Sequence, residues 1–134
     1  MTRAHFLTFV GIVAVAISAF ALVAPAVLLE HVKHAEATAS AQVMARTVGV
    51  LLLSVGALNL MVRRHPDSPT MRSVLWANLL LQLAILPIDP IAWAIGAFDG
   101  LDSFVPNTIL HFVLAAGFAG LLFRASADRV PTER

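Results

Sequence analysis

The sequence has no cysteine and few charged residues. Only 13% of its 134 residues are charged, whereas 59% are hydrophobic; a soluble domain has about 25% charged residues. Without cysteine the chain cannot form disulfides, thiolate nucleophiles, iron–sulfur clusters or zinc sites with cysteine ligands. The shortage of charge and the mean hydropathy of +0.85 exclude a disordered chain, a nucleic-acid-binding protein and an ordinary water-soluble enzyme.

Common catalytic signatures are also missing. The sequence has no G-x-G-x-x-G, P-loop, H-E-x-x-H or G-x-S-x-G pattern. The segment EHVKH, from Glu30 to His34, has two histidines three residues apart beside a glutamate. His-x-x-His is frequent by chance and Lys33 interrupts this one, so we interpret the segment as a solvated loop rather than a metal site.

Four long apolar runs dominate the chain. Each is about long enough to cross a hydrocarbon core of about 30 Å, where only a helix pairs all of its own backbone amides. The sequence therefore predicts an all-α fold, an integral membrane four-helix bundle forming one domain over residues 1–134, with spans at about 6–29, 41–63, 72–88 and 104–124. A cleaved signal peptide is the alternative for the first run; the run is long for a signal core and Pro25 lies in the would-be cleavage site, which favours a retained span.

Basic residues are distributed unevenly between the predicted loops. Only Lys33 and Arg46 lie on or near one side of the bundle, and seven arginines lie on the other. Because basic residues favour the cytoplasmic side, we predict cytoplasmic N- and C-termini, with residues 30–45 and 89–103 outside. The seven arginines are Arg3, Arg63, Arg64, Arg72, Arg124, Arg129 and Arg134.

The third run is interrupted by prolines. Pro87 and Pro90 flank Asp89, and proline removes a helix hydrogen bond and clashes with the preceding turn. We therefore expect the third helix to be kinked or broken near Pro87–Pro90. The segment that follows should run along the outer interface, with Trp93 as an anchor.

Arg46 is the most costly residue in the predicted spans. An arginine at a helix centre costs about 2.5–3.5 kcal/mol to insert, so it is a candidate functional residue. Two interpretations stay open. Either its long stem carries the guanidinium to the outer headgroups, or it faces the bundle and pairs with an anionic ligand or a carboxylate, of which Asp89 is the first choice and Glu30 the second.

Two further sets of polar residues share helix faces. Asn78, Gln82 and Asp89 are spaced by four and seven residues, which places them on one stripe that should face inward. Asn107 and His111 are four apart near the outer end of the fourth span. The structural alternatives are interhelical hydrogen bonds for the amides, an N-cap for Asp89 and simple packing for His111.

Apart from Asn78, these residues are all predicted to lie in the outer half of the bundle. The predicted site is a polar pocket that opens to the outside and is closed below by apolar side chains. Asp89 and His111 are the candidates for catalytic proton transfer. No metal site and no particular cofactor is predicted, and the candidates for ligand binding are Arg46, Asn78, Gln82 and Asn107.

Small residues mark two of the predicted helices. Gly49 and Gly56 lie one heptad apart on the second span, and Ala116 and Gly120 have small-xxx-small spacing on the fourth. Such residues let helices approach closely, so we expect tight packing within one bundle or between bundles. Asn59 is expected to bond to a neighbouring backbone carbonyl.

Two stretches resemble a family. ARTVGVLLLSVGALNLMVRR, from Ala45 to Arg64, and HPDSPTMRSVLWANLL, from His65 to Leu80, are similar to the middle of small four-helix bacterial membrane proteins of the DoxX-like group and of neighbouring uncharacterised families. The resemblance lies in the arginine and glycines of the second span, its basic end and the Asp-Ser-Pro turn. It implies a four-helix integral membrane protein of the bacterial inner membrane; some members of the group are membrane subunits of quinone-linked oxidoreductases.

Three functions remain open from the sequence. The first is an accessory or binding subunit of a homo-oligomer or a larger membrane complex. The second is a membrane enzyme acting on a lipid-soluble small molecule such as a quinone or isoprenoid, and the third is a small transporter or channel. The expected partners are the lipid bilayer, a second copy or another membrane subunit, and a hydrophobic small molecule, but not nucleic acid.

Overall fold

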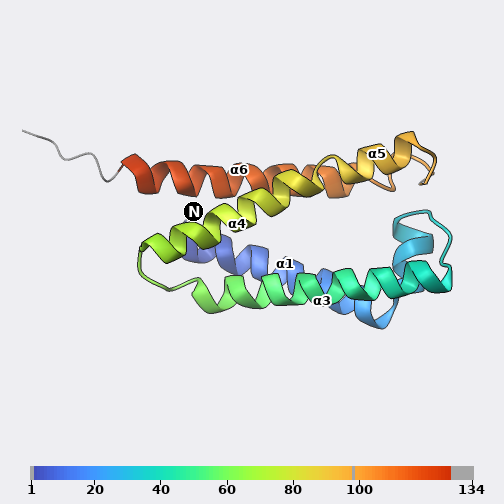
Figure 1. The fold of residues 1–134 in the computed structure, drawn as a ribbon, viewed down its shortest axis with the longest axis horizontal. Helices are drawn as coiled ribbons and strands as arrows, with labels where there is room; N and C mark the ends of the chain where they lie inside the picture. The colour runs from blue at the N-terminus through green and yellow to red at the C-terminus, as the bar shows by residue number, and fades with distance from the viewer. Residues whose placement is uncertain (1, 98, 128–134) are drawn as a thin grey trace, which may run out of the picture.

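The computed structural model describes residues 2–97 and 99–127, and these residues form an all-helical architecture (Figure 1). Four long helices lie roughly along the long axis of the molecule (Figure 1), and three short elements lie in the connections between them. The long helices are α1 (Arg3–Val23), α3 (Ala39–Val62), α4 (Pro69–Ile85) and α6 (Val105–Ala127). The short elements are α2 (Pro25–Val27), the π-helical turn η1 (Leu28–Val32) and α5 (Ile88–Ala94).

Four segments are long and apolar enough to cross a membrane, as the sequence predicts. Their bounds are Arg3–Val23, Ala39–Val62, Pro69–Ala94 and Val105–Arg124. Large apolar side chains are exposed along all four, so the apolar residues do not simply fill a core. A surface of this kind is typical of helices that face hydrocarbon.

Hydroxyl side chains fix where three of the long helices begin. Thr2, Thr38 and Ser68 precede α1, α3 and α4, and each side-chain oxygen accepts a hydrogen bond from the backbone N–H three residues on. Such a cap satisfies one of the amides that a helix start leaves unpaired. Pro69 follows Ser68 in the first turn of α4, where a missing N–H costs nothing.

The first helix is shorter than predicted at its carboxyl end. The predicted span reaches residue 29, but α1 ends at Val23 and Ala24 leaves the helical conformation, with φ −131° and ψ 55°. Pro25 lacks the N–H that would continue the helix, and its ring clashes with the preceding turn. The chain then turns through α2 and η1 instead of continuing straight.

The third long helix stops before its prolines. Helix α4 ends at Ile85, and α5 begins at Ile88. The ring of Trp93 in α5 lies against Phe104, with centroids 5.4 Å apart. Helix α5 continues past the end of α4, and the chain after it turns back to the start of α6 (Figure 1).

The long helices associate as two pairs, α1 with α3 and α4 with α6 (Figure 1). In the first pair, glycines allow a close crossing: a Cβ added to Gly56 would lie 3.0 Å from the backbone oxygen of Gly11. Ser18 in α1 donates a hydrogen bond of 2.8 Å to the backbone oxygen of Gly49. The glycine stripe of α3 therefore packs against α1 within the same chain.

The two ends of the bundle differ in character. We call the end where α1 begins and α6 ends the arginine end, because Arg63, Arg64, Arg72 and Arg124 lie there; the opposite end, with η1 and α5, is the polar end. Toward the arginine end the two pairs meet in an apolar core, where the rings of Phe6 and Phe118 pack edge to face at 4.9 Å. Its other buried members are Leu7, Val10, Met71, Leu75, Leu79, Leu114, Ala115 and Leu122.

Candidate functional site

The polar end is organised around Asp89. This residue lies in the first turn of α5 and is 8% exposed. Its Oδ2 atom accepts a hydrogen bond from Nζ of Lys33, which is also an ion pair, and a second of 2.7 Å from Nδ2 of Asn107. One carboxylate oxygen thus joins the segment after η1, the short helix α5 and the start of α6.

Arg46 does not take part in this cluster. Its side chain is exposed on α3, and no hydrogen bond or ion pair joins it to another residue within 2–97 and 99–127. The suggested pairing of Arg46 with Asp89 or Glu30 does not form, and Lys33 holds Asp89 instead. The reason is the pairing of helices: α3 packs on α1, whereas α5 packs on α4 and α6.

Gln82 and His111 form a second contact between helices. Nδ1 of His111 lies 2.5 Å from Oε1 of Gln82. An amide carbonyl can only accept, so the imidazole donates through Nδ1. Gln82 is 5% exposed, and its oxygen would otherwise be buried without a partner.

Asn59 and Asn78 form a third contact, between α3 and α4. Nδ2 of Asn59 donates to Oδ1 of Asn78 at 2.9 Å, and Nδ2 of Asn78 donates to the backbone oxygen of Val74. Asn59 is fully buried, and its Oδ1 atom has no hydrogen-bond partner among the residues that the structure describes. The backbone partner predicted for Asn59 is wrong, because a side chain from the next helix takes that place.

The stripe on the third span therefore binds four residues from three different segments. Asn78, Gln82 and Asp89 are all buried, at 4%, 5% and 8% exposure. We call their contacts with Asn59, with His111, and with Lys33 and Asn107 the polar ladder. The ladder joins α3 to α4, α4 to α6, and the η1 segment to both α5 and α6, so it links the two helix pairs.

A more exposed contact flanks the ladder at the polar end. Nε2 of His34, just after Lys33, lies 3.5 Å from Oδ2 of Asp102. Glu30 and His31 are exposed, and the described ranges contain no cluster of three or more potential metal-binding side chains. The EHVKH segment thus contributes Lys33 and His34 to bridges between segments.

Lys33 is the site residue that sequence reasoning missed. Its position in an exposed-looking loop concealed its role. The available signal was charge: Lys33 is the only basic residue other than Arg46 outside the arginine-rich side of the predicted bundle. A buried aspartate on that side therefore has few basic side chains with which it can form an ion pair.

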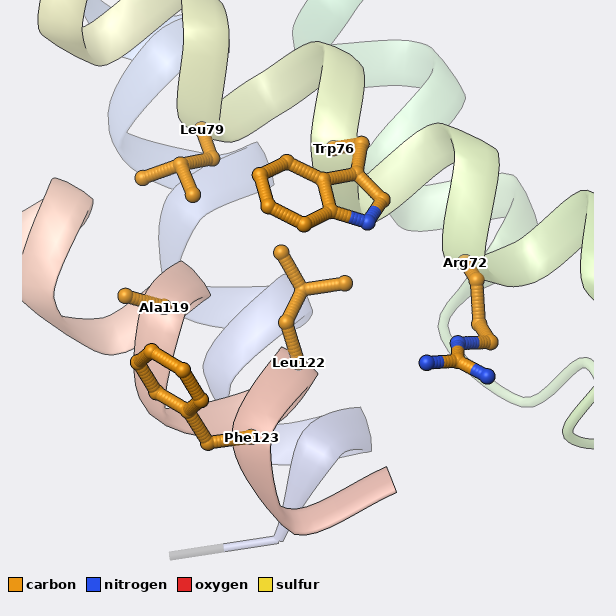
Figure 2. Close-up of a pocket in the computed structure, with 6 residues that line it drawn as sticks. All are labelled: Arg72, Trp76, Leu79, Ala119, Leu122 and Phe123. Atoms are coloured by element: carbon orange, nitrogen blue, oxygen red, sulfur yellow. The ribbon is translucent and has the colours of Figure 1, made fainter. Parts of the chain in front are cut away.

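Two hollows lie away from the polar ladder, toward the arginine end. One, of about 90 Å³, lies between α4 and α6; Figure 2 shows Trp76 and Leu79 facing Ala119 and Leu122, with Arg72 to one side. The other, of about 230 Å³, lies between α1 and α6. Its lining consists of Phe6, Ala116, Gly117, Gly120, Leu121 and Arg124. Neither hollow is lined by a residue of the ladder.

The chemistry of the ladder is that of internal pairing. Asp89, Gln82, Asn107 and His111, which the sequence singled out, come together, but each bonds to another residue of the chain. Comparison with family models, with curated proteins and with solved structures finds no match to this chain.

Proposed function

We propose that this chain is a multi-pass membrane protein that serves as an accessory or binding subunit, in a homo-oligomer or in a larger membrane complex. The observation that carries the proposal is the polar ladder: the buried amide and carboxylate side chains of α4 and α5 bond within the chain. These groups are thereby engaged in holding the bundle together, as polar side chains do between helices in lipid. Contacts with other molecules would then be made by the outer surface of the bundle.

Helix α3 offers the most extensive surface of this kind. It packs on α1 through its glycine face, and its other faces carry exposed apolar side chains. Thr47 and Ser54, also exposed, each donate to a backbone oxygen of their own helix, at 3.0 and 3.1 Å. Apart from Arg46, this surface of α3 thus exposes few polar groups that lack a hydrogen bond within the helix.

Arg46 would determine which neighbouring membrane helix this face of α3 binds. It lies seven residues after Ala39, roughly 10 Å along the helix from its start. A guanidinium at that depth gains most from an acceptor within the membrane. A carboxylate or carbonyl group on a neighbouring membrane helix would supply that acceptor, and the apolar side chains around Arg46 would pack on the same helix.

The DoxX-like resemblance fits this proposal, because that group includes membrane subunits of larger assemblies. The enzyme alternative requires a ligand pocket around Arg46, Asp89 and His111. Arg46 lies outside the cluster, and the other two are bonded internally, so this geometry does not favour the enzyme.

The proposal is tested by the size of the complex in native membranes. The full chain is extracted in mild detergent and sized on native gels, with Arg46→Leu, Arg46→Lys and the control Arg64→Leu, which removes a charge at the arginine end. We expect a species larger than the monomer for the wild type, Arg46→Lys and Arg64→Leu, and a shift toward the monomer for Arg46→Leu. Monomer size for the wild type, or an equal effect of Arg64→Leu, would contradict the proposal.

A further inference from the structure

The larger hollow lies on the surface of the bundle between α1 and α6. Its floor is made by small residues: a Cβ added to Gly120 would meet nothing within 4 Å, so the space above it is open. At Gly117, one turn nearer the polar end, the ring of Phe6 already fills that space, because an added Cβ would lie 2.3 Å from it. The result is a slot of about 230 Å³ with Phe6 as one wall.

The slot follows the axis of α6 and ends at a cation. It extends from Ala116 past Gly120 to Arg124, which is eight residues, or roughly 12 Å at 1.5 Å per residue. Arg124 lies one turn beyond Gly120, in the last turns of α6. A chain-like apolar molecule lying in the slot would therefore bring its head to the guanidinium.

The charge at the arginine end indicates which charge the head group of the bound molecule should carry. Arg3, Arg63, Arg64, Arg72 and Arg124 gather at the arginine end, and Asp67 of the α3–α4 loop is ion-paired to Arg3 at 2.6 Å. Among the described residues of this end, positive charge thus exceeds negative charge. Each basic residue near a membrane surface attracts anionic lipid by about 1 kcal/mol.

The width of the slot favours a lipid chain over a helix. Bulky side chains share the lining of the slot with the small residues: Phe6 comes from α1 and Leu121 from α6. A partner helix is about 10 Å across and needs a longer smooth surface to approach closely. An acyl chain is narrow enough to lie between these side chains.

We propose that this slot binds an anionic phospholipid, with an acyl chain over Gly120 and the phosphate at Arg124. The proposal rests on membrane insertion but not on assembly through Arg46. Under the predicted orientation the lipid belongs to the cytoplasmic leaflet, where anionic headgroups are concentrated.

The test measures lipid selectivity of the full chain in bilayer discs containing phosphatidylglycerol and phosphatidylcholine, by counting the lipids retained in native mass spectrometry. Wild type should retain phosphatidylglycerol preferentially. Arg124→Gln should lower that preference about fivefold, the equivalent of about 1 kcal/mol. Gly120→Leu should abolish retention by filling the slot, since nothing stands within 4 Å of its Cβ.

One control variant and three further results separate the outcomes. Arg64→Gln makes the same charge change at the same end but outside the slot, and it should lower the preference less than Arg124→Gln does; if it matches Arg124→Gln, the attraction is diffuse and the site is overturned. Retention unchanged in Gly120→Leu would also overturn it. Disulfide-linked dimers of Gly120→Cys in a bilayer would overturn it in favour of a helix contact. A chain that fails to enter the discs refutes membrane insertion, which is distinct from an inserted chain without lipid preference.

Discussion

Lys33 and Asp89 form an ion pair that connects the segment after η1 to the short helix α5. The side chains are 20% and 11% exposed, so the pair is largely withdrawn from solvent. Asn107 donates to the same carboxylate oxygen. Because these three residues come from different segments, their contacts form a clasp at the polar end of the bundle.

Removing Asp89 alone should be more damaging than removing both partners. Asp89→Leu leaves the Lys33 ammonium without its carboxylate, and we expect a loss of about 3 kcal/mol in the free energy of unfolding. The double variant Lys33→Met/Asp89→Leu should recover part of that loss, because no unpaired charge remains. Unfolding in mixed detergent micelles, followed by circular dichroism, measures both, with the exposed Asp99→Asn as control. Additive losses would contradict the clasp.

Three glycine-to-alanine variants should rank by the space at each Cβ. At Gly56 the new methyl lies 2.9 Å from Val15 and 3.0 Å from a backbone oxygen, at Gly49 it lies 3.1 Å from Leu22, and at Gly120 it meets nothing within 4 Å. We expect Gly56→Ala to destabilise by about 1–3 kcal/mol through overpacking, Gly49→Ala by less, and Gly120→Ala to stabilise by up to about 1 kcal/mol through helix propensity. The same unfolding assay checks the order, and equal effects at 56 and 120 would refute the close α1–α3 crossing.

His111 should carry its proton on Nδ1. The carbonyl oxygen of Gln82 accepts from that nitrogen at 2.5 Å, which holds the neutral ring in the Nδ1–H tautomer. Nitrogen NMR of the protein labelled at histidine distinguishes the two tautomers. We expect Gln82→Leu to lose the signal of the Nδ1–H form, whereas Asn59→Leu, at another rung of the ladder, should retain it. A wild-type ring protonated only on Nε2 would contradict the contact.

Local patterns predicted the helices and the inward-facing stripe. Long apolar runs require helices in lipid, and the spacing of Asn78, Gln82 and Asp89 depends only on helical periodicity, so both can be read along the chain. The two prolines after Ile85 also indicated where α4 ends.

The partners of those residues could not be predicted in the same way. Which helix faces which stripe depends on long-range packing, so the sequence suggested Arg46 as a partner for Asp89 and did not indicate Lys33. The early end of α1 determines which basic residue reaches Asp89. Pro25 stops the helix at Val23, and the turn through η1 brings Lys33 to Asp89. A straight helix to residue 29 would have followed another path.

The central claim is that the polar ladder closes within one chain, with Lys33 and not Arg46 at Asp89. The chain has no cysteine, so introduced thiols are unique. The most direct measurement is therefore intramolecular cross-linking in membranes by a short bifunctional thiol reagent, comparing Lys33→Cys/Asp89→Cys with Arg46→Cys/Asp89→Cys. We expect efficient cross-linking within the monomer for the first pair and little for the second; preferential cross-linking of the second pair would contradict the account.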